Sequence, residues 1–138
     1  LELQIQQRET EMPGSFEMLV LARLVAAVPR ERAALEGQLA ELVLRGELSS
    51  GEPQCSINLQ PRKGQAAGSL SHNPVTGIAP DSDSVPIVFQ LILDGGWLAE
   101  LAMFKADGSS VVTLPSVEAI AVKDTDEARP GKVQHLWP

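Results

Sequence analysis

The sequence predicts an α+β fold in which two N-terminal helices pack on a mainly antiparallel meander sheet of four to six strands. Apolar residues recur every three or four positions over residues 16–42, which is the spacing of a buried helix face. Beyond residue 42 they recur at every second position, which is the spacing of strands. Turns that contain glycine, such as Asp94-Gly95 and Asp107-Gly108, separate the strand-like runs.

Two helices are expected at the start of the domain. The first covers residues 16–27, and Ser15 is its expected N-cap because a hydroxyl there accepts an otherwise unpaired backbone N–H. Pro29 ends this helix and suits the first turn of the next, which is expected over residues 30–42. Leucines line one face of the second helix, and polar residues that include Gln38 are expected to face solvent on the others.

The rest of the domain predicts strands joined by turns. Strands are expected at residues 42–48, 52–60, 75–79, 85–93, from 97 onward and 110–114, with 117–122 as a last strand or a helical turn. Residues 61–74 hold little apolar mass, so a long exposed loop is expected there. The chain divides into an N-terminal extension (1–14, with a short strand over 1–6), one α+β domain (15–122) and a C-terminal tail (123–138).

Two apolar runs on either side of residues 94–96 predict a β-hairpin. A three-residue loop over these residues places Phe89 opposite Leu101 and makes one face of the hairpin entirely apolar. A slip of one residue would exchange the two faces. In the predicted register Glu100 lies on the face away from Leu91, and the Asp-Gly steps are interpreted as turns.

A Val-Pro-hydrophobic strand, a strand with a glycine followed by Leu-x-Glu-Leu, and an aromatic-x-x-Asp-Gly turn follow one another in this region. The residues concerned are Val85, Pro86, Gly96, Leu98, Glu100, Leu101, Phe104, Asp107 and Gly108. This arrangement resembles the C-terminal hairpin of a family of small uncharacterised bacterial proteins, and the resemblance spans roughly residues 16–122. It implies a fold and no activity. It also implies more cysteine ahead of the second strand than the single Cys55, which argues against a metal or redox role.

Charge and composition narrow the classes of partner. The formal net charge of −7 repels phosphates and anionic lipid heads, so neither nucleic acid nor a membrane is an expected partner. The longest apolar run, residues 16–28, is too short to span a bilayer and contains Arg23. A single cysteine, Cys55, cannot form an internal disulfide, which suits the cytoplasm.

No catalytic residue, metal site or cofactor is expected, and the sequence leans against an enzyme. Cys55 with His72 or His135 as base is one arrangement for nucleophilic catalysis, but a lone cysteine on a strand is more often a structural thiol. The two histidines lack the short spacing of zinc ligands. Asp81 begins a stretch that starts like a calcium loop, but Pro86 stands where that loop requires glycine.

Two surfaces are candidates for binding. Arg62 and Lys63 open a stretch without acidic residues that also holds His72, and this stretch is either a site for an anionic ligand or acidic partner, or a solvated loop. The second surface is the outer face of the hairpin, where three of four expected residue pairs are apolar. The residues expected in an interface are Val88, Ile92, Leu98 and Phe104, with Trp137 in the tail.

The outer face needs a cover because two short helices suffice for only one face of the sheet. A second copy of the chain in a two-fold homodimer is the preferred cover, and the N-terminal segment and the C-terminal tail are the alternatives. The expected function is that of a small non-catalytic interaction or accessory protein. The alternative is a domain or small enzyme that binds a small molecule or anion near residues 61–74.

Overall fold

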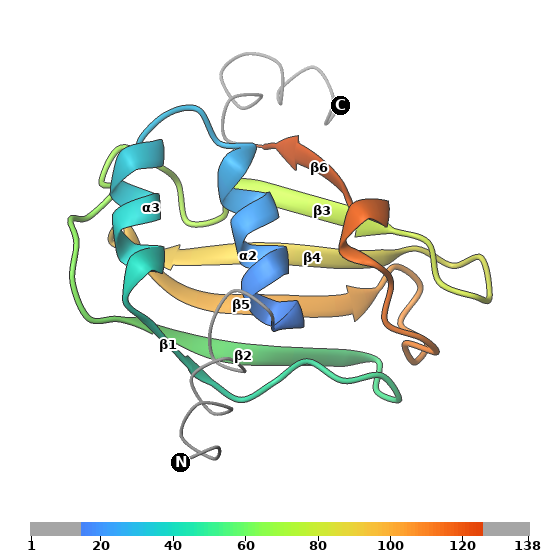
Figure 1. The fold of residues 1–138 in the computed structure, drawn as a ribbon. Helices are drawn as coiled ribbons and strands as arrows, with labels where there is room; N and C mark the ends of the chain where they lie inside the picture. The colour runs from blue at the N-terminus through green and yellow to red at the C-terminus, as the bar shows by residue number, and fades with distance from the viewer. Residues whose placement is uncertain (1–14, 126–138) are drawn as a thin grey trace.

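The computed structural model describes residues 15–125, so the expected strand over 1–6 and Trp137 lie outside the described residues. The elements in chain order are α2 (Phe16–Ala26), α3 (Arg32–Ala40), β1 (Leu42–Arg45), β2 (Gln54–Pro61), β3 (Val75–Ala79), β4 (Ile87–Asp94), β5 (Trp97–Lys105), the 3₁₀ helix η1 (Val117–Ala119) and β6 (Ala121–Asp124). Both α-helices lie on one face of the sheet, and no described helix lies on the other (Figure 1). The predicted α+β class is confirmed. None of the described helices has the length and apolar character needed to cross a membrane.

Helix α2 begins as the sequence predicts. Ser15 Oγ accepts a hydrogen bond from Met18 N at 3.1 Å, which satisfies one of the free N–H groups of the first turn. Helix α3 is shorter than expected at both ends. Before its first turn, Glu31 adopts a left-handed conformation with a φ of 60°, and its carboxylate accepts a hydrogen bond from Ser69 N at 2.9 Å.

The strand order in the sheet is β1-β2-β5-β4-β3-β6, and each neighbouring pair is antiparallel. Three pairs, β1–β2, β3–β4 and β4–β5, join consecutive strands as in a meander. The pairs β2–β5 and β3–β6 join strands that are distant in the sequence. Strand β1 ends at Arg45, three residues before the end that was expected. Residues 117–122 were expected to form a strand or a helical turn, and they contain both a helical turn and the start of a strand.

The core lies between the helices and the inner face of the sheet. Phe89 on β4 is fully buried, and its ring meets that of Phe16 edge-on at a centroid distance of 6.4 Å. Helix α2 crosses β3 so closely that a Cβ on Gly77 would lie 3.1 Å from Leu24 Cδ2 and 2.7 Å from Ile120 Cγ2. A larger residue at position 77 would therefore displace the helix or the start of β6.

The central hairpin has a different loop from the predicted one. Only Gly95 and Gly96 form the turn, with φ values of 59° and 90°, so Asp94 pairs with Trp97. A register shift follows between Ile92 and Leu93, because Ala99 is an extra residue in β5. This is a β-bulge, in which two residues of one strand oppose one residue of its partner.

The bulge alters the register but preserves the predicted faces of β4 and of β5 from Glu100 onward. Phe89 lies opposite Met103, so the predicted pairing of Phe89 with Leu101 is wrong. Leu101 pairs with Leu91 instead, and Glu100 lies on the face away from Leu91, as predicted. A two-residue turn alone would have brought Glu100 opposite Leu91. The extra residue moves the pairing one step further and returns the charge to the outer face.

The segment at residues 110–114, expected as a strand, is not part of the sheet. Val111 N donates to Glu52 O at 2.9 Å, and Val111 O accepts a hydrogen bond from Gly51 N at 2.7 Å. On the other side of the segment, two backbone N–H groups donate to the carboxylate of Asp81. A side chain thus takes the place of a partner strand.

The loop at residues 61–74 is not fully exposed as predicted. Ala67 and Leu70 are buried, and Ala67 N donates a 2.8 Å hydrogen bond to Gly96 O. A Cβ on Gly96 would lie 2.8 Å from the Ala67 backbone, so only glycine permits this approach. The middle of the loop therefore packs on the tip of the hairpin.

Candidate functional site

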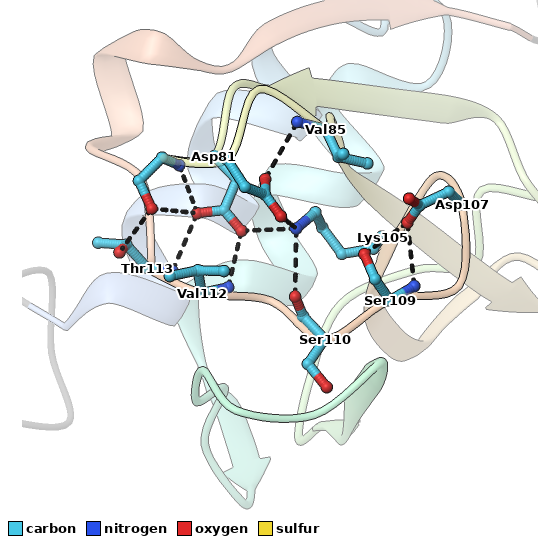
Figure 2. Close-up of polar contacts among 10 residues, drawn as sticks. Asp81, Val85, Lys105, Asp107, Ser109, Ser110, Val112 and Thr113 are labelled. Atoms are coloured by element: carbon cyan, nitrogen blue, oxygen red, sulfur yellow. Dashed lines mark hydrogen bonds and ion pairs between the residues drawn. The ribbon is translucent and has the colours of Figure 1, made fainter.

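A buried polar cluster lies where β5 ends. Lys105 Nζ donates to Asp81 Oδ2 at 2.9 Å, to Asp83 Oδ2 at 2.7 Å and to Ser110 O at 3.1 Å (Figure 2). The side chains of Lys105 and Asp81 are fully buried. All three ammonium protons are used in these contacts, so Lys105 has no donor left for a ligand.

The charges of this cluster are fixed by its contacts. Burial on its own raises the pKa of Asp81, but hydrogen bonds from Val112 N, Lys105 and Thr113 N outweigh it and hold that pKa well below its usual range. The pKa of Asp83 is also lowered, chiefly by the hydrogen bond that Asp83 accepts from Lys105. Burial alone would lower the pKa of Lys105, yet its bonds to both carboxylates raise it. The carboxylates stay ionised and the lysine protonated at neutral pH, which suits a structural ion pair and not a general acid or base.

The residues predicted to form an anion site do not come together. Arg62 and Lys63 follow β2, and Lys63 Nζ lies 3.3 Å from Glu41 Oε2. His72 precedes β3, where its carbonyl accepts a 2.8 Å hydrogen bond from Leu93 N. Strands β5 and β4 lie between β2 and β3, so about three strand spacings of roughly 4.8 Å separate the two ends of the loop. The geometry therefore gives no support to a pocket built from these three side chains.

Cys55 lies half-buried on the inner face of β2, and its Sγ is 3.7 Å from Glu47 O. Ile57 and Leu59 share that face and are buried, as predicted. His72 lies beside the hairpin tip, away from the strand row that holds Cys55. Within residues 15–125 there is also no group of three His, Cys, Asp or Glu able to hold a metal ion.

The outer face of the sheet carries an apolar row at one end. Ile78 of β3, Val88 of β4 and Phe104 of β5 lie opposite one another in register. Ile78 is 48% exposed, and the other two are half-buried. Ile92 also lies on this face, as predicted. The predicted outer position of Leu98 is wrong, because the bulge turns it into the core, where it is 1% exposed.

Strand β2 makes the neighbouring part of the outer face polar. Its outward residues are all exposed, and they are Gln54, Ser56, Asn58 and Gln60. The outer face is therefore apolar at one end of β3, β4 and β5, where the row lies, whereas Thr76, Gln90 and Glu100 follow on the same face and β2 is polar throughout.

The comparison with known families agrees with this architecture. A family model described as Domain of unknown function (DUF6984) matches residues 15–115, which contain both α-helices and the first five strands. The chain belongs to this family. In this DUF6984 protein, β6 lies beyond the matched residues and completes the sheet beside β3. No curated protein and no solved structure matched the chain.

A buried glutamine of the DUF6984 domain links α3, the loop after β2 and the hairpin tip, and the sequence did not predict its burial. Gln38 of α3 is fully buried, against the prediction that it faces solvent. Its Nε2 donates to Gln65 O at 2.8 Å and to Gly96 O at 2.9 Å, and its Oε1 accepts from Leu98 N at 2.7 Å. Because it bonds a carbonyl and an N–H two residues apart, the carboxamide replaces a backbone amide of a neighbouring strand.

The buried lysine of the DUF6984 domain was also missed, although the sequence held a signal for it. The alternation of Leu101 and Met103 continues to Lys105, which puts a lysine on the buried face. A buried ammonium requires carboxylates close by, and Asp81 and Asp83 precede the partner strand. Their short spacing therefore reflects a lysine ion pair and not a calcium loop.

Proposed function

We propose that this DUF6984 domain is a non-catalytic interaction module that forms a two-fold homodimer through the outer face of its sheet. The observation that carries the proposal is the row of Ile78, Val88 and Phe104, over which no described helix lies. Apolar side chains gathered on an uncovered face are typical of protein interfaces. The single cysteine and the resemblance of the hairpin to small bacterial proteins support a place in a bacterial cytoplasm.

The outer face has the dimensions of a standard interface. The six strands are four to nine residues long, and at about 4.8 Å between strands and about 3.3 Å per residue they present roughly 600 Å² in projection. A stable interface takes about 800 Å² of accessible surface from each partner, and accessible surface exceeds projected area. Face-to-face packing of two copies would place the apolar rows, which lie at one end of the face, against each other, with the exposed residues of β2 at the edge of the contact.

The polar clusters support binding over catalysis. The protons of Lys105 are all used in fixed hydrogen bonds, and those bonds hold the turn before β4 against the segment after β5. Cys55 has a backbone carbonyl, Glu47 O, as its nearest polar partner. Both arrangements stabilise the fold without offering a reactive group.

Light scattering coupled to size exclusion tests the dimer. At micromolar concentration we expect twice the 14.8 kDa mass of one chain. Val88→Glu should yield a monomer, because a carboxylate at the centre of the row would be buried without a partner. Gln54→Glu is the matched control, since Gln54 lies opposite Phe104 on the same face and is already polar and exposed. A wild-type mass of one chain, or a dimer that survives Val88→Glu, would refute the proposal.

A further inference from the structure

We propose that a groove at the opposite end of the outer face, between β2 and β5, binds a neutral saccharide. The pairing of β2 with β5 ends at Asn58 and Glu100. Strand β2 nevertheless continues to Pro61, and β5 already begins at Trp97. The two strands therefore separate just where the Ala99 bulge lies. Bulges terminate pairing and redirect side chains, and they are over-represented beside active and binding sites.

The separation of the strands is built into the fold. Leu98 N would be the next donor toward β2, but Gln38 Oε1 accepts its hydrogen bond from the inner side at 2.7 Å. Pro61 has no N–H to offer to β5. The Leu98 N–H is thus satisfied without closing the gap.

The resulting groove has the size of a ligand site. Its volume is about 610 Å³, within the range of about 300–1,000 Å³ typical of small-molecule sites. Leu59 and Leu98 also border it, although their side chains are buried in the core. The other lining residues are Arg45, Asn58, Gln60, Asp94, Trp97 and Ala99.

The chemistry of the lining matches a sugar ring. Trp97 is 37% exposed and is the only aromatic residue among the exposed large apolar side chains of the described range. An exposed indole offers a flat surface for the C–H face of a pyranose. Arg45 Nε and Nη2 donate to Gln60 Oε1 at 3.1 Å and 2.8 Å, so these two side chains are held in place. Sugar hydroxyls both donate and accept, and the carboxamides of Asn58 and Gln60 do the same.

Other ligand classes fit the groove less well. Arg45 and Asp94 balance each other within the lining, and the chain carries a net charge of −7, so phosphate-bearing ligands find no excess positive charge. A protein hot spot requires an apolar, fully desolvated surround, whereas the rim here consists of amides and charges. The groove also lies about 20 Å along β4 from the apolar row, since six residues separate Val88 from Asp94. It is therefore separate from the apolar row, and a dimer that used the whole outer face would also cover it.

Tryptophan fluorescence tests the site. The chain has two tryptophans, so Trp137→Phe leaves Trp97 as the sole reporter. Cellohexaose and chitohexaose serve as neutral probes, and a heparin hexasaccharide serves as the anionic comparison. We expect at least one neutral probe to shift the emission at millimolar concentration or below, and the heparin probe to have no effect. An ¹⁵N-correlation titration should move the amide signals of Asn58, Gln60 and Ala99.

Variants connect any binding to the groove. In the full chain, titrated by amide shifts, Trp97→Ala should weaken binding about tenfold or more, while Trp97→Phe, which keeps an aromatic face, should lose less. Gln60→Ala should also weaken it, and Ser56→Ala, outside the groove on the same face, should not. Val88→Glu should leave binding intact even where it abolishes the dimer. No response to either neutral probe, binding of the heparin probe alone, or unchanged affinity in a folded Trp97→Ala variant would overturn the proposal.

Discussion

Replacement of Gln38 by leucine should destabilise the domain well beyond the cost of an ordinary polar-to-apolar change. Leucine has a similar size but removes three hydrogen bonds. Leu98 N then becomes a buried donor without a partner, which costs about 1–3 kcal/mol. Gly96 O keeps its bond from Ala67 N, and Gln65 O lies near the surface, so these two losses cost about 0.5–1.5 kcal/mol each at most. We expect a loss of about 2–6 kcal/mol, or roughly 6–22 °C in Tm.

Chemical denaturation and hydrogen exchange measure this effect. The free energy of unfolding of Gln38→Leu should fall by the stated amount, and the Leu98 amide should lose more protection than amides in α2. Glu36→Ala, at an exposed position of the same helix, is the matched control and should change stability by less than about 0.5 kcal/mol. A loss below about 0.5 kcal/mol in Gln38→Leu, or a Leu98 amide as protected as in the wild type, would show that the carboxamide does not stabilise the hairpin tip.

The stability of a Gln38→Glu variant should depend on pH for the same reason. Its carboxylate accepts from Leu98 N but faces the carbonyl oxygens of Gln65 and Gly96, so the folded state should raise its pKa above the unfolded value of about 4.3. A raised pKa means that the stability deficit is largest at neutral pH and shrinks as the pH falls toward the unfolded value. Unfolding measured against wild type at each pH should show this recovery. A deficit that is independent of pH would contradict it.

Two further predictions concern groups at other places in the fold. The lowered pKa values of Asp81 and Asp83 stabilise the native state at pH values above the unfolded pKa of about 3.9, so the free energy of unfolding should fall more steeply below about pH 5. Asp81→Asn should flatten that slope and lower the stability at neutral pH. An unchanged acid-unfolding profile in Asp81→Asn, measured by circular dichroism, would count against this. Cys55→Ser should cost less than about 1 kcal/mol and leave the dimer mass and any saccharide affinity unchanged, and a change in either readout would assign the thiol a functional role.

The features that the sequence predicted well depend on local signals. Ser15 caps α2 because the cap involves residues only three apart, and Pro29 marks the break between the helices for a similarly local reason. The strand at residues 75–79 was predicted with its observed bounds, since Pro74 and Pro80 flank it and end the neighbouring loops. Such signals do not require knowledge of the partner segment.

The hairpin register was missed because two different loops satisfy the same local pattern. A three-residue loop, and a two-residue turn followed by a one-residue bulge, both leave Glu100 on the outer face. Leu98 and Trp97 distinguish them, because the bulge turns Leu98 inward and Trp97 outward. Both side chains are apolar and would suit either the core or an interface, so the sequence could not decide between the two.

The position of Gln38 could not be predicted because its partners are far apart in the chain. The residue lies one turn after the buried Leu35 on an amphipathic helix, but its polar side chain indicates a solvent-facing position and nothing within α3 names a partner for it. Its three hydrogen bonds reach residues 27, 58 and 60 positions away. The need for a buried carboxamide arises only once the loop after β2 and the bulged hairpin are placed together.

The bulge, Gln38 and the groove are best explained as parts of one arrangement. A hairpin without the bulge could extend the β2–β5 pairing toward Trp97, and Leu98 N could then bond to β2 instead of a side chain. The fold instead keeps the pairing short, satisfies the freed backbone with Gln38 from the inner side, and leaves Trp97 half-exposed at the open end. A packing defect would be expected to leave unsatisfied buried polar atoms, yet no such side-chain atom occurs in the described residues. A gap that is open on the outside, and whose Leu98 N–H is satisfied from the inside, is consistent with the proposed saccharide site.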